Sequence, residues 1–217
     1  MKIKNKEIKG VIFDLDGTLL DSCLIWQDID DIFFSKRGID KPDDYADSIG
    51  HIGLEKAALY TIERFNLKDT KEEILNEWKQ GVLDHYANKV KLKPHAKEYI
   101  KYLKDNNIPI CAATANDEDC YKAALCNNGI YDEFKFILEI NKYHNSKENP
   151  DIYIDAANKL GVDINNCVVF EDLYIGLKAA KEAGFITVAV YEETCKDEIK
   201  KEELADYYLK DFAELII

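Results

Sequence analysis

The segment VIFDLDGTLLDS (residues 11–22) joins a short apolar run to a cluster of acidic and turn-forming residues, and this junction determines the expected fold. An unbroken apolar run such as 11–13 is typical of a strand that is buried on both faces of a parallel sheet. The run stops at Asp14, and Gly17 permits a tight turn directly after Asp16. We therefore expect a buried strand whose carboxyl end carries two aspartates.

These two aspartates suit different chemical tasks. Because Asp14 and Asp16 are one residue apart, their side chains point to opposite sides of an extended chain. A divalent cation bound by the Asp14 side chain can meet Asp16 through its backbone carbonyl, which leaves the Asp16 carboxylate free. A carboxylate beside a cation can attack phosphorus, and a second acid can protonate the departing oxygen. The Asp16-Gly17 dipeptide by itself predicts only a turn.

The composition indicates a globular protein and disfavours several classes of partner. The 217 residues are 47% hydrophobic and 33% charged, which is compatible with a sizeable core. A formal net charge of -13 argues against nucleic acid and anionic membranes as partners, because both repel an acidic surface. No apolar run is long enough to span a bilayer, and the lysine-rich residues 1–9 are not followed by a signal-peptide segment. We expect a cytoplasmic protein whose scattered cysteines remain free thiols.

Helical periodicity follows the opening segment without an intervening strand. Apolar residues recur at helical spacing in three segments, which are residues 23–36, about 54–65 and about 71–88. A turn-rich stretch, residues 40–47, separates the first two. Several consecutive helices between two strands suggest an inserted helical domain. We expect a small all-helical cap over residues 19–91 and a discontinuous core formed by residues 1–18 and 92–217.

Strands and helices alternate in the remainder of the chain. The expected strands are 108–114, 134–140, 167–170 and 186–190. The expected helices are 94–105, 119–127, 149–161 and 173–184. This alternation predicts an α/β fold, a Rossmann-like parallel sheet with helices on both faces, and a binding crevice beyond the carboxyl ends of the strands.

Polar residues stand at the ends of two of these strands. Thr114, Ala115 and Asn116 offer a hydroxyl and amide groups to phosphoryl oxygens. Glu171 and Asp172 offer hard oxygen ligands of the kind that Mg²⁺ prefers. Taken alone, each group also fits a helix cap at a strand-to-helix turn.

Several segments resemble the motifs of the haloacid dehalogenase superfamily. Asp14 to Leu19 (DLDGTL) resembles the first motif, and the apolar strand that ends in Thr114 resembles the second. Lys147, one of 29 cationic residues and by number alone a surface lysine, stands shortly before Pro150-Asp151 as in the third motif. Phe170 to Gly184, with its acidic pair, resembles the fourth. The order of motifs, with helices between the first two, is similar to the beta-phosphoglucomutase and phosphoglycolate phosphatase subgroup.

The resemblance implies roles for the residues that match. Asp14 is the expected nucleophile that forms an aspartyl-phosphate, and Asp16 the acid that protonates the leaving alcohol and then activates water. Thr114 and Lys147 are expected to hold the phosphoryl group, together with the amide groups of Ala115 and Asn116.

The resemblance also implies a Mg²⁺ cofactor. Its expected ligands are the side chain of Asp14, the backbone carbonyl of Asp16 and the side chain of Asp172. Glu171 is expected either to bind the metal directly or to stand just outside its ligands.

Two positions depart from the family pattern. Glu148 replaces the proline that commonly follows the lysine, and Leu173 replaces a serine that usually follows the second acid. Loss of that hydroxyl can loosen the orientation of the metal ligands. A non-catalytic binding module of the same fold therefore stays open as an alternative.

The reaction expected from the resemblance is hydrolysis of a small phosphomonoester, a sugar phosphate or similar. Dehalogenases lack the second aspartate, so Asp16 argues against dehalogenation. Sugar phosphomutases of the subgroup carry a cap histidine where this chain has Trp26, and a cap arginine, for which only Arg37 and Arg64 are available. A mutase of the beta-phosphoglucomutase type remains the alternative.

Cap residues are expected to select the phosphate ester when the cap closes over the site. The candidates are Trp26, His51 in a glycine-flanked loop, and Lys79. The sequence predicts neither the particular ester nor the oligomeric state.

Overall fold

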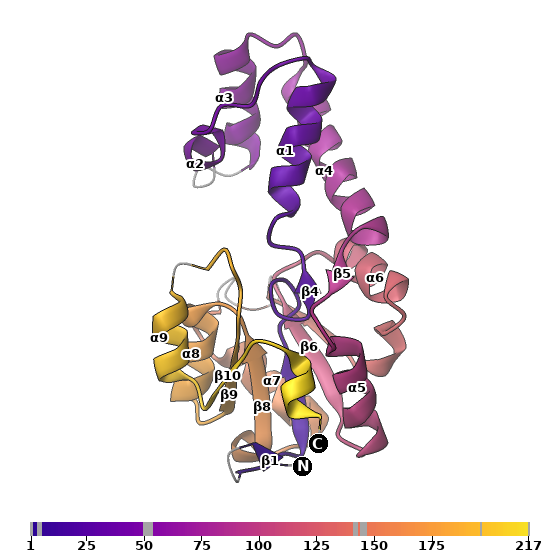
Figure 1. Cartoon of the computed structure of the whole chain (residues 1–217), viewed down its shortest axis with the longest axis vertical. Coiled ribbons are helices and arrows are strands. Elements are labelled where there is room, and N and C mark those ends of the chain that lie inside the picture. Colours follow the sequence, from indigo (N-terminus) through magenta and orange to yellow (C-terminus); the bar gives the residue numbers. More distant parts are fainter. Residues whose placement is uncertain are drawn as a thin grey trace. The chain divides into compact units, whose positions relative to one another are not determined.

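The predicted opening strand is β3 (Gly10–Phe13), and all of its residues are buried. In the computed structural model, which describes residues 2–3, 6–49, 54–140, 143, 147–195 and 197–216, β3 lies inside a parallel sheet (Figure 1). The strand order is β10-β9-β8-β3-β6-β7. The other strands are β6 (Ile110–Thr114), β7 (Ile137–Glu139), β8 (Cys167–Glu171), β9 (Ile186–Val190) and β10 (Tyr207–Leu209). This architecture confirms the predicted α/β fold.

Alternate residues of β3 point to opposite faces of the parallel sheet. Ile12 packs among buried residues of α7 (Asp151–Leu160) and α8 (Tyr174–Glu182). Phe13 faces an aromatic cluster, with Phe170 at 4.8 Å between ring centroids and Tyr99 at 6.3 Å. Tyr99 belongs to α5 (Ala96–Asp105), so helices cover both faces. Burial of a side chain such as Phe13 contributes about 1.5–3 kcal/mol to folding.

Shorter elements complete this unit. Two helices are α6 (Glu118–Asn127) and α9 (Glu198–Leu204), of which α9 packs beside α8 and β10 (Figure 1). A hairpin is formed by β1 (Lys2–Ile3) and β2 (Lys6–Glu7). Single 3₁₀ turns are η1 (Tyr131–Glu133), η3 (Ile164–Asn166) and η4 (Phe212–Leu215). All six cysteines are free thiols.

The helical segment is a separate compact unit. Residues 24–89 form one unit, and residues 1–23 with 90–217 form the other. The helical unit contains α1 (Ile25–Lys36), α2 (Tyr45–Ile49), α3 (Leu54–Phe65) and α4 (Lys71–Asn88). Its core is aromatic, with the rings of Phe34 and Tyr45 4.7 Å apart and those of Phe33 and Trp78 5.8 Å apart. Within the described ranges, no helix has the length and apolar character needed to cross a membrane.

The units divide at residues 23/24 and 89/90, whereas the sequence placed the boundaries at 18/19 and 91/92. β4 (Leu20–Asp21) pairs in antiparallel fashion with β5 (Lys91–Leu92). The backbone N–H of Lys93 also donates to Leu19 O at 2.8 Å. The two segments that link the units, residues 19–21 and 91–93, are therefore hydrogen-bonded to each other within the sheet-containing unit. The helical unit begins only beyond them.

Several short elements had no counterpart in the sequence prediction, including α2, β10 and the β4–β5 pair. α2 lies across the end of the stretch expected to form turns, and it is too short to show helical periodicity. β10 has three residues and its sequence, YYL, is preceded by a charged helix rather than by a turn signal. The β4–β5 pair consists of two-residue strands, whose formation depends on a partner distant in sequence.

Asp30 of α1 is a buried carboxylate, only 5% exposed. Burial raises its pKa to about 6, Asp31 adds to the rise, and Lys41 opposes it. Because the folded protein keeps this proton at a pH where the unfolded chain has lost it, the free energy of unfolding falls as pH rises from about 4 to about 6. The ionised group is thus destabilising at neutral pH.

We expect Asp30→Asn to raise the free energy of unfolding by about 1–2 kcal/mol at pH 7 and to leave it nearly unchanged at about pH 3. Urea denaturation of parent and variant at both pH values, followed by tryptophan fluorescence, measures the difference. Equal stability of the two proteins at pH 7 would contradict the assignment of a costly buried charge.

Candidate active site

The carboxyl ends of β3, β6 and β8 bring the predicted residues together. Phe13 pairs with Ala112 of β6 and with Phe170 of β8, so the three strands end at one edge of the sheet. The backbone N–H of Asp14 donates to Phe170 O at 3.0 Å, which fixes the start of the motif loop against β8. Thr114 is the last residue of β6 and Glu171 the last residue of β8.

Asp14 and Lys147 form the central ion pair of this edge. The Asp14 side chain is buried, and its Oδ1 accepts a hydrogen bond from Lys147 Nζ. Lys147 Nζ also donates to Glu171 Oε1 at 2.5 Å. Burial lowers the pKa of Lys147, but Asp14 and Glu171 outweigh it and raise that pKa above its ordinary value. Lys147 is therefore a charged residue between two carboxylates rather than a surface lysine.

Glu171 is fully buried and has a hydrogen-bond donor on each oxygen. Besides Lys147, the Tyr153 hydroxyl donates to Oε1 at 2.9 Å, and the backbone N–H of Leu173 donates to Oε2 at 3.0 Å. Leu173, which replaces the usual serine, thus still orients Glu171 through its backbone. The side-chain hydroxyl that donates to Glu171 is that of Tyr153 in α7.

Two glycines allow the loops to approach these side chains closely. A Cβ at Gly176 would lie 2.5 Å from Glu171 Oε1 and 2.8 Å from the Tyr153 hydroxyl. A Cβ at Gly17 would lie 2.4 Å from Asp172 Oδ2, and Gly17 has a positive φ of 77°. A larger residue at either position would displace a carboxylate of the site.

The three buried acids suit a hard divalent cation. Asp14, Glu171 and Asp172 each offer an oxygen, and these oxygens lie within 4.8 Å of one another. Burial, with Glu171 adding to it, raises the pKa of Asp172 to about 7. Burial likewise raises the pKa of Asp14 well above its usual range, although Lys147 opposes this. The ammonium of Lys147 does not by itself balance three carboxylates, and a metal such as Mg²⁺ would supply further positive charge.

The Thr18 hydroxyl connects two of these acids. Thr18 Oγ1 lies 3.0 Å from Asp14 Oδ2 and 3.2 Å from Asp172 Oδ1, so its proton can be donated to either carboxylate. Thr18 is fully buried. It joins the motif loop to the end of β8.

Asp16 accepts hydrogen bonds from two neutral side chains. Ser22 Oγ donates to Asp16 Oδ1 at 2.7 Å, and Asn116 Nδ2 donates to Oδ2 at 3.0 Å. The backbone N–H of Asn116 donates to Thr114 Oγ1 at 3.0 Å, while Ala115 is exposed beside it. The Asn116 side chain therefore orients the predicted acid, a contact that the sequence did not indicate.

The predicted cap residues belong to the helical unit. Trp26 is on α1 and 42% exposed, and Lys79 is an exposed residue of α4. His51 lies outside the described residues. Their proposed contacts with substrate stay predictions.

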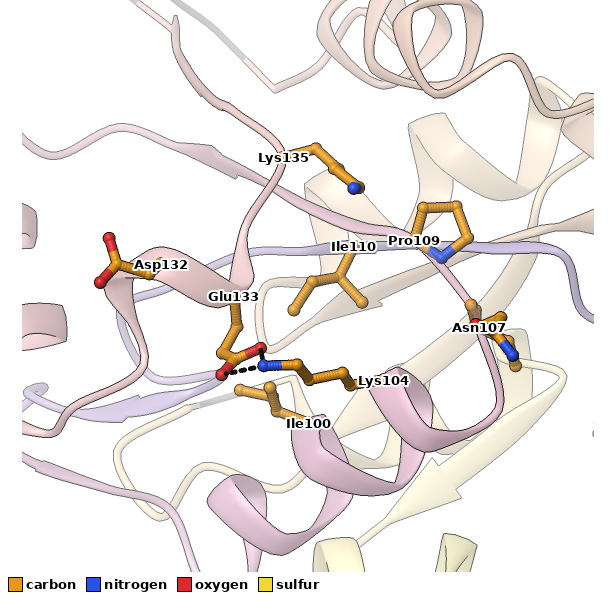
Figure 2. A pocket seen from close by; sticks show the side chains of 9 residues that line it. Ile100, Lys104, Asn107, Pro109, Ile110, Asp132, Glu133 and Lys135 are labelled. Carbon is orange, nitrogen blue, oxygen red and sulfur yellow. Dashed lines mark hydrogen bonds and ion pairs between the residues drawn. The ribbon is translucent and has the colours of Figure 1, made fainter.

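A polar pocket of about 320 Å³ occupies the opposite end of the sheet, near the start of β6 (Figure 2). Ile110, the first residue of β6, contributes to it, and Lys104 and Glu133 form an ion pair beside it with an N–O distance of 2.8 Å. None of the predicted site residues lines this pocket. The candidate active-site residues lie at the carboxyl ends of β3, β6 and β8 instead.

Lys201 of α9 is a buried cation that the sequence analysis missed. Its side chain is fully buried, and Nζ donates to Asp172 O at 2.6 Å and to Val190 O at 3.0 Å. Glu198 Oε1 lies 2.5 Å from the same nitrogen. Lys201 thus ties the ends of β8 and β9 together directly behind the Asp172 carboxylate.

We expect Lys201→Met to weaken Mg²⁺ binding by about 10–100-fold, because loss of a group that orients a metal ligand has effects of that size. Isothermal titration calorimetry with MgCl₂ measures the affinity. Lys181→Met is the matched control, since Lys181 pairs with Asp206 on the surface of the same unit. Unchanged Mg²⁺ affinity in the folded Lys201 variant would contradict this positioning role.

The fold and these residues define a hydrolase class. Residues 11–190 match the family model of haloacid dehalogenase-like hydrolases, and the chain belongs to this family. The predicted family and the predicted enzyme class are thereby confirmed.

Sequence relatives match most of the chain. Hexitol phosphatase B of Escherichia coli K12 is 25% identical over 213 residues, which are 97% of this chain and 95% of that protein. (DL)-glycerol-3-phosphatase 2 of Arabidopsis thaliana is 29% identical over 212 residues, 92% of this chain and 85% of that protein. The crystal structure of beta-phosphoglucomutase from Clostridium difficile shares the fold, with a TM-score of 0.64 and 24% identity over 96% of this chain and 93% of that chain. The chain is thus similar in sequence to phosphatases and in fold to a mutase.

Proposed function

We propose that the protein is a magnesium-dependent phosphatase that hydrolyses a small phosphomonoester, a sugar phosphate or similar, through an aspartyl-phosphate on Asp14. The observation that carries this proposal is the environment of Asp14. Its buried carboxylate pairs with Lys147 and lies within 4.8 Å of oxygens of Glu171 and Asp172. Phosphoryl transfer requires mainly positioning and charge neutralisation, and this arrangement provides both.

The reaction follows from the two aspartates. A carboxylate oxygen of Asp14 attacks phosphorus, the bond from phosphorus to the ester oxygen breaks, and Asp16 gives its proton to the departing alkoxide. Asp16, now ionised, accepts a proton from water, which attacks phosphorus and releases phosphate from Asp14. The hydrogen bonds of Ser22 and Asn116 hold Asp16 in place for both steps.

Cations at the site balance the charge of the phosphoryl group. Lys147 is placed to neutralise Asp14 and a phosphoryl oxygen together, and Thr114 ends the neighbouring strand β6. Mg²⁺, held by Asp14, Asp172 and the backbone carbonyl of Asp16, would supply further positive charge. Glu171, whose oxygens accept hydrogen bonds from Lys147, Tyr153 and Leu173, orients Lys147 and stands beside the metal site.

The arginines of the helical unit favour hydrolysis over a mutase reaction. Arg37 binds Asp69 and Glu77 at 2.7 and 2.8 Å and stacks over the Phe33 ring. Arg64 binds Asp44 at 2.8 Å. Both guanidinium groups are thus engaged within the unit, and neither is available to hold a second phosphate without losing these partners.

We expect Asp14→Asn to lower Mg²⁺-dependent phosphate release by at least about 10³-fold, because the amide is not a competent nucleophile. Phosphate is measured with a panel of sugar phosphates, phosphoglycolate and glycerol phosphate, with MgCl₂ and with chelator. Asp132→Asn is a control, since this exposed residue lies by the pocket at the opposite edge (Figure 2). Indistinguishable release from the folded Asp14 variant and the parent would refute the assigned nucleophile.

With a sugar 1-phosphate as substrate, we expect inorganic phosphate as the main product. ³¹P NMR of the reaction, with and without a sugar bisphosphate as activator, resolves phosphate from the 6-phosphate. Faster formation of the 6-phosphate than of inorganic phosphate would identify a mutase instead.

A further inference from the structure

The helices of the helical unit line a pocket of about 410 Å³. Its walls are mainly apolar and include Trp26, Ile49, Leu54 and Ala57. This volume falls in the range of pockets that hold small organic molecules. All of these residues belong to residues 24–89, so the pocket is a property of this unit alone.

One carboxylate interrupts the apolar wall. Asp30 lines the pocket and is 5% exposed, and no described residue donates a hydrogen bond to its oxygens. The nearest compensating cation, Lys41, forms its ion pair with the neighbouring Asp31 instead. A pKa of about 6 leaves Asp30 mostly ionised at neutral pH. The pocket thus contains a negative charge that the protein itself leaves without a hydrogen-bonding partner.

A second polar atom in the wall also lacks a partner. Trp78 lines the pocket, and its buried indole Nε1 donates to no acceptor in the described part of the chain. Buried polar groups are hydrogen-bonded in the great majority of cases, so an unpaired donor calls for an explanation. An acceptor on a bound molecule provides one.

We propose that this pocket binds an organic amine, in which an apolar body fills the walls and a protonated nitrogen donates to Asp30. A cation is favoured over a neutral donor because a charge-assisted hydrogen bond to a largely buried carboxylate is the stronger one. The indole face of Trp26 adds an attraction for a cation that a hydroxyl would not receive. An acceptor elsewhere on the ligand pairs with the Trp78 N–H.

The cost of Asp30 to folding supports a role in binding. A buried carboxylate without a donor destabilises the free protein, and destabilising groups are retained where they serve function. A ligand ammonium would restore the missing interaction. An asparagine at this position would fill the same space without the charge.

The chain offers a direct optical readout of this pocket. It has two tryptophans, and both Trp26 and Trp78 line the pocket. Titration of the protein with 2-phenylethylamine, 2-phenylethanol and 3-phenylpropionate, which share an apolar body, therefore follows occupancy by tryptophan fluorescence. We expect the amine to bind at least about tenfold more tightly than the alcohol, and the carboxylate to bind most weakly.

The variant Asp30→Asn isolates the charge. We expect it to weaken binding of 2-phenylethylamine by at least about tenfold and to change binding of 2-phenylethanol little. Asp28→Asn is the matched control, because Asp28 is an exposed acid on the same helix and does not line the pocket. Amine binding that is absent in the parent, equal to that of the carboxylate, or unchanged in the Asp30 variant would overturn the proposal.

The amine can be part of the phosphate ester or a separate molecule, and kinetics distinguishes these sources. If the pocket takes the alcohol portion of the substrate, 2-phenylethylamine raises the KM for the preferred ester without changing kcat. If it takes a separate ligand, the amine binds and leaves that KM unchanged. Because the titration uses no phosphate ester, it reports on the pocket even where the proposed phosphatase activity fails.

Discussion

The ion pairs of Lys147 with Asp14 and Glu171 are the interactions on which the candidate active site depends. Three buried carboxylates at the ends of two strands, β3 and β8, would repel one another, and Lys147 supplies an ammonium that lies between two of them. The remaining negative charge is reflected in the raised pKa of Asp172, which burial and Glu171 produce. A site in this state favours a divalent cation.

The geometry of the sheet and two glycines make this concentration of charge possible. Parallel strands end at one edge, so Asp14 and Glu171 approach each other without any adjustment of the loops. Gly17 and Gly176 leave the space in which Asp172 and Glu171 lie. Lys201 then fixes the backbone of Asp172 from the far side. Gly17, Gly176 and Lys201 thus act by positioning the acids of the site.

The sequence predicted the elements whose signals are local. Apolar runs that stop at Asp14, Thr114 and Glu171 identify strand ends directly, and the strand ends are where the acids meet. Tyr153 and Lys201 were not predicted, because the sequence around a buried helical residue does not indicate which atom its side chain will contact. Their partners, Glu171 and the Asp172 carbonyl, are 18 and 29 residues away in sequence and become neighbours only in the folded sheet.

Asp14 and Asp30 show two ways in which this chain uses a buried carboxylate. Asp14 is paired with Lys147, which it shares with Glu171 and which keeps it oriented before any ligand arrives. Asp30 receives no hydrogen bond from the described residues, so its carboxylate remains available to an incoming donor. A group that must react needs the first arrangement, because its position has to be fixed. A group that must discriminate among ligands gains from the second, because a molecule without the matching charge leaves the carboxylate buried and unpaired.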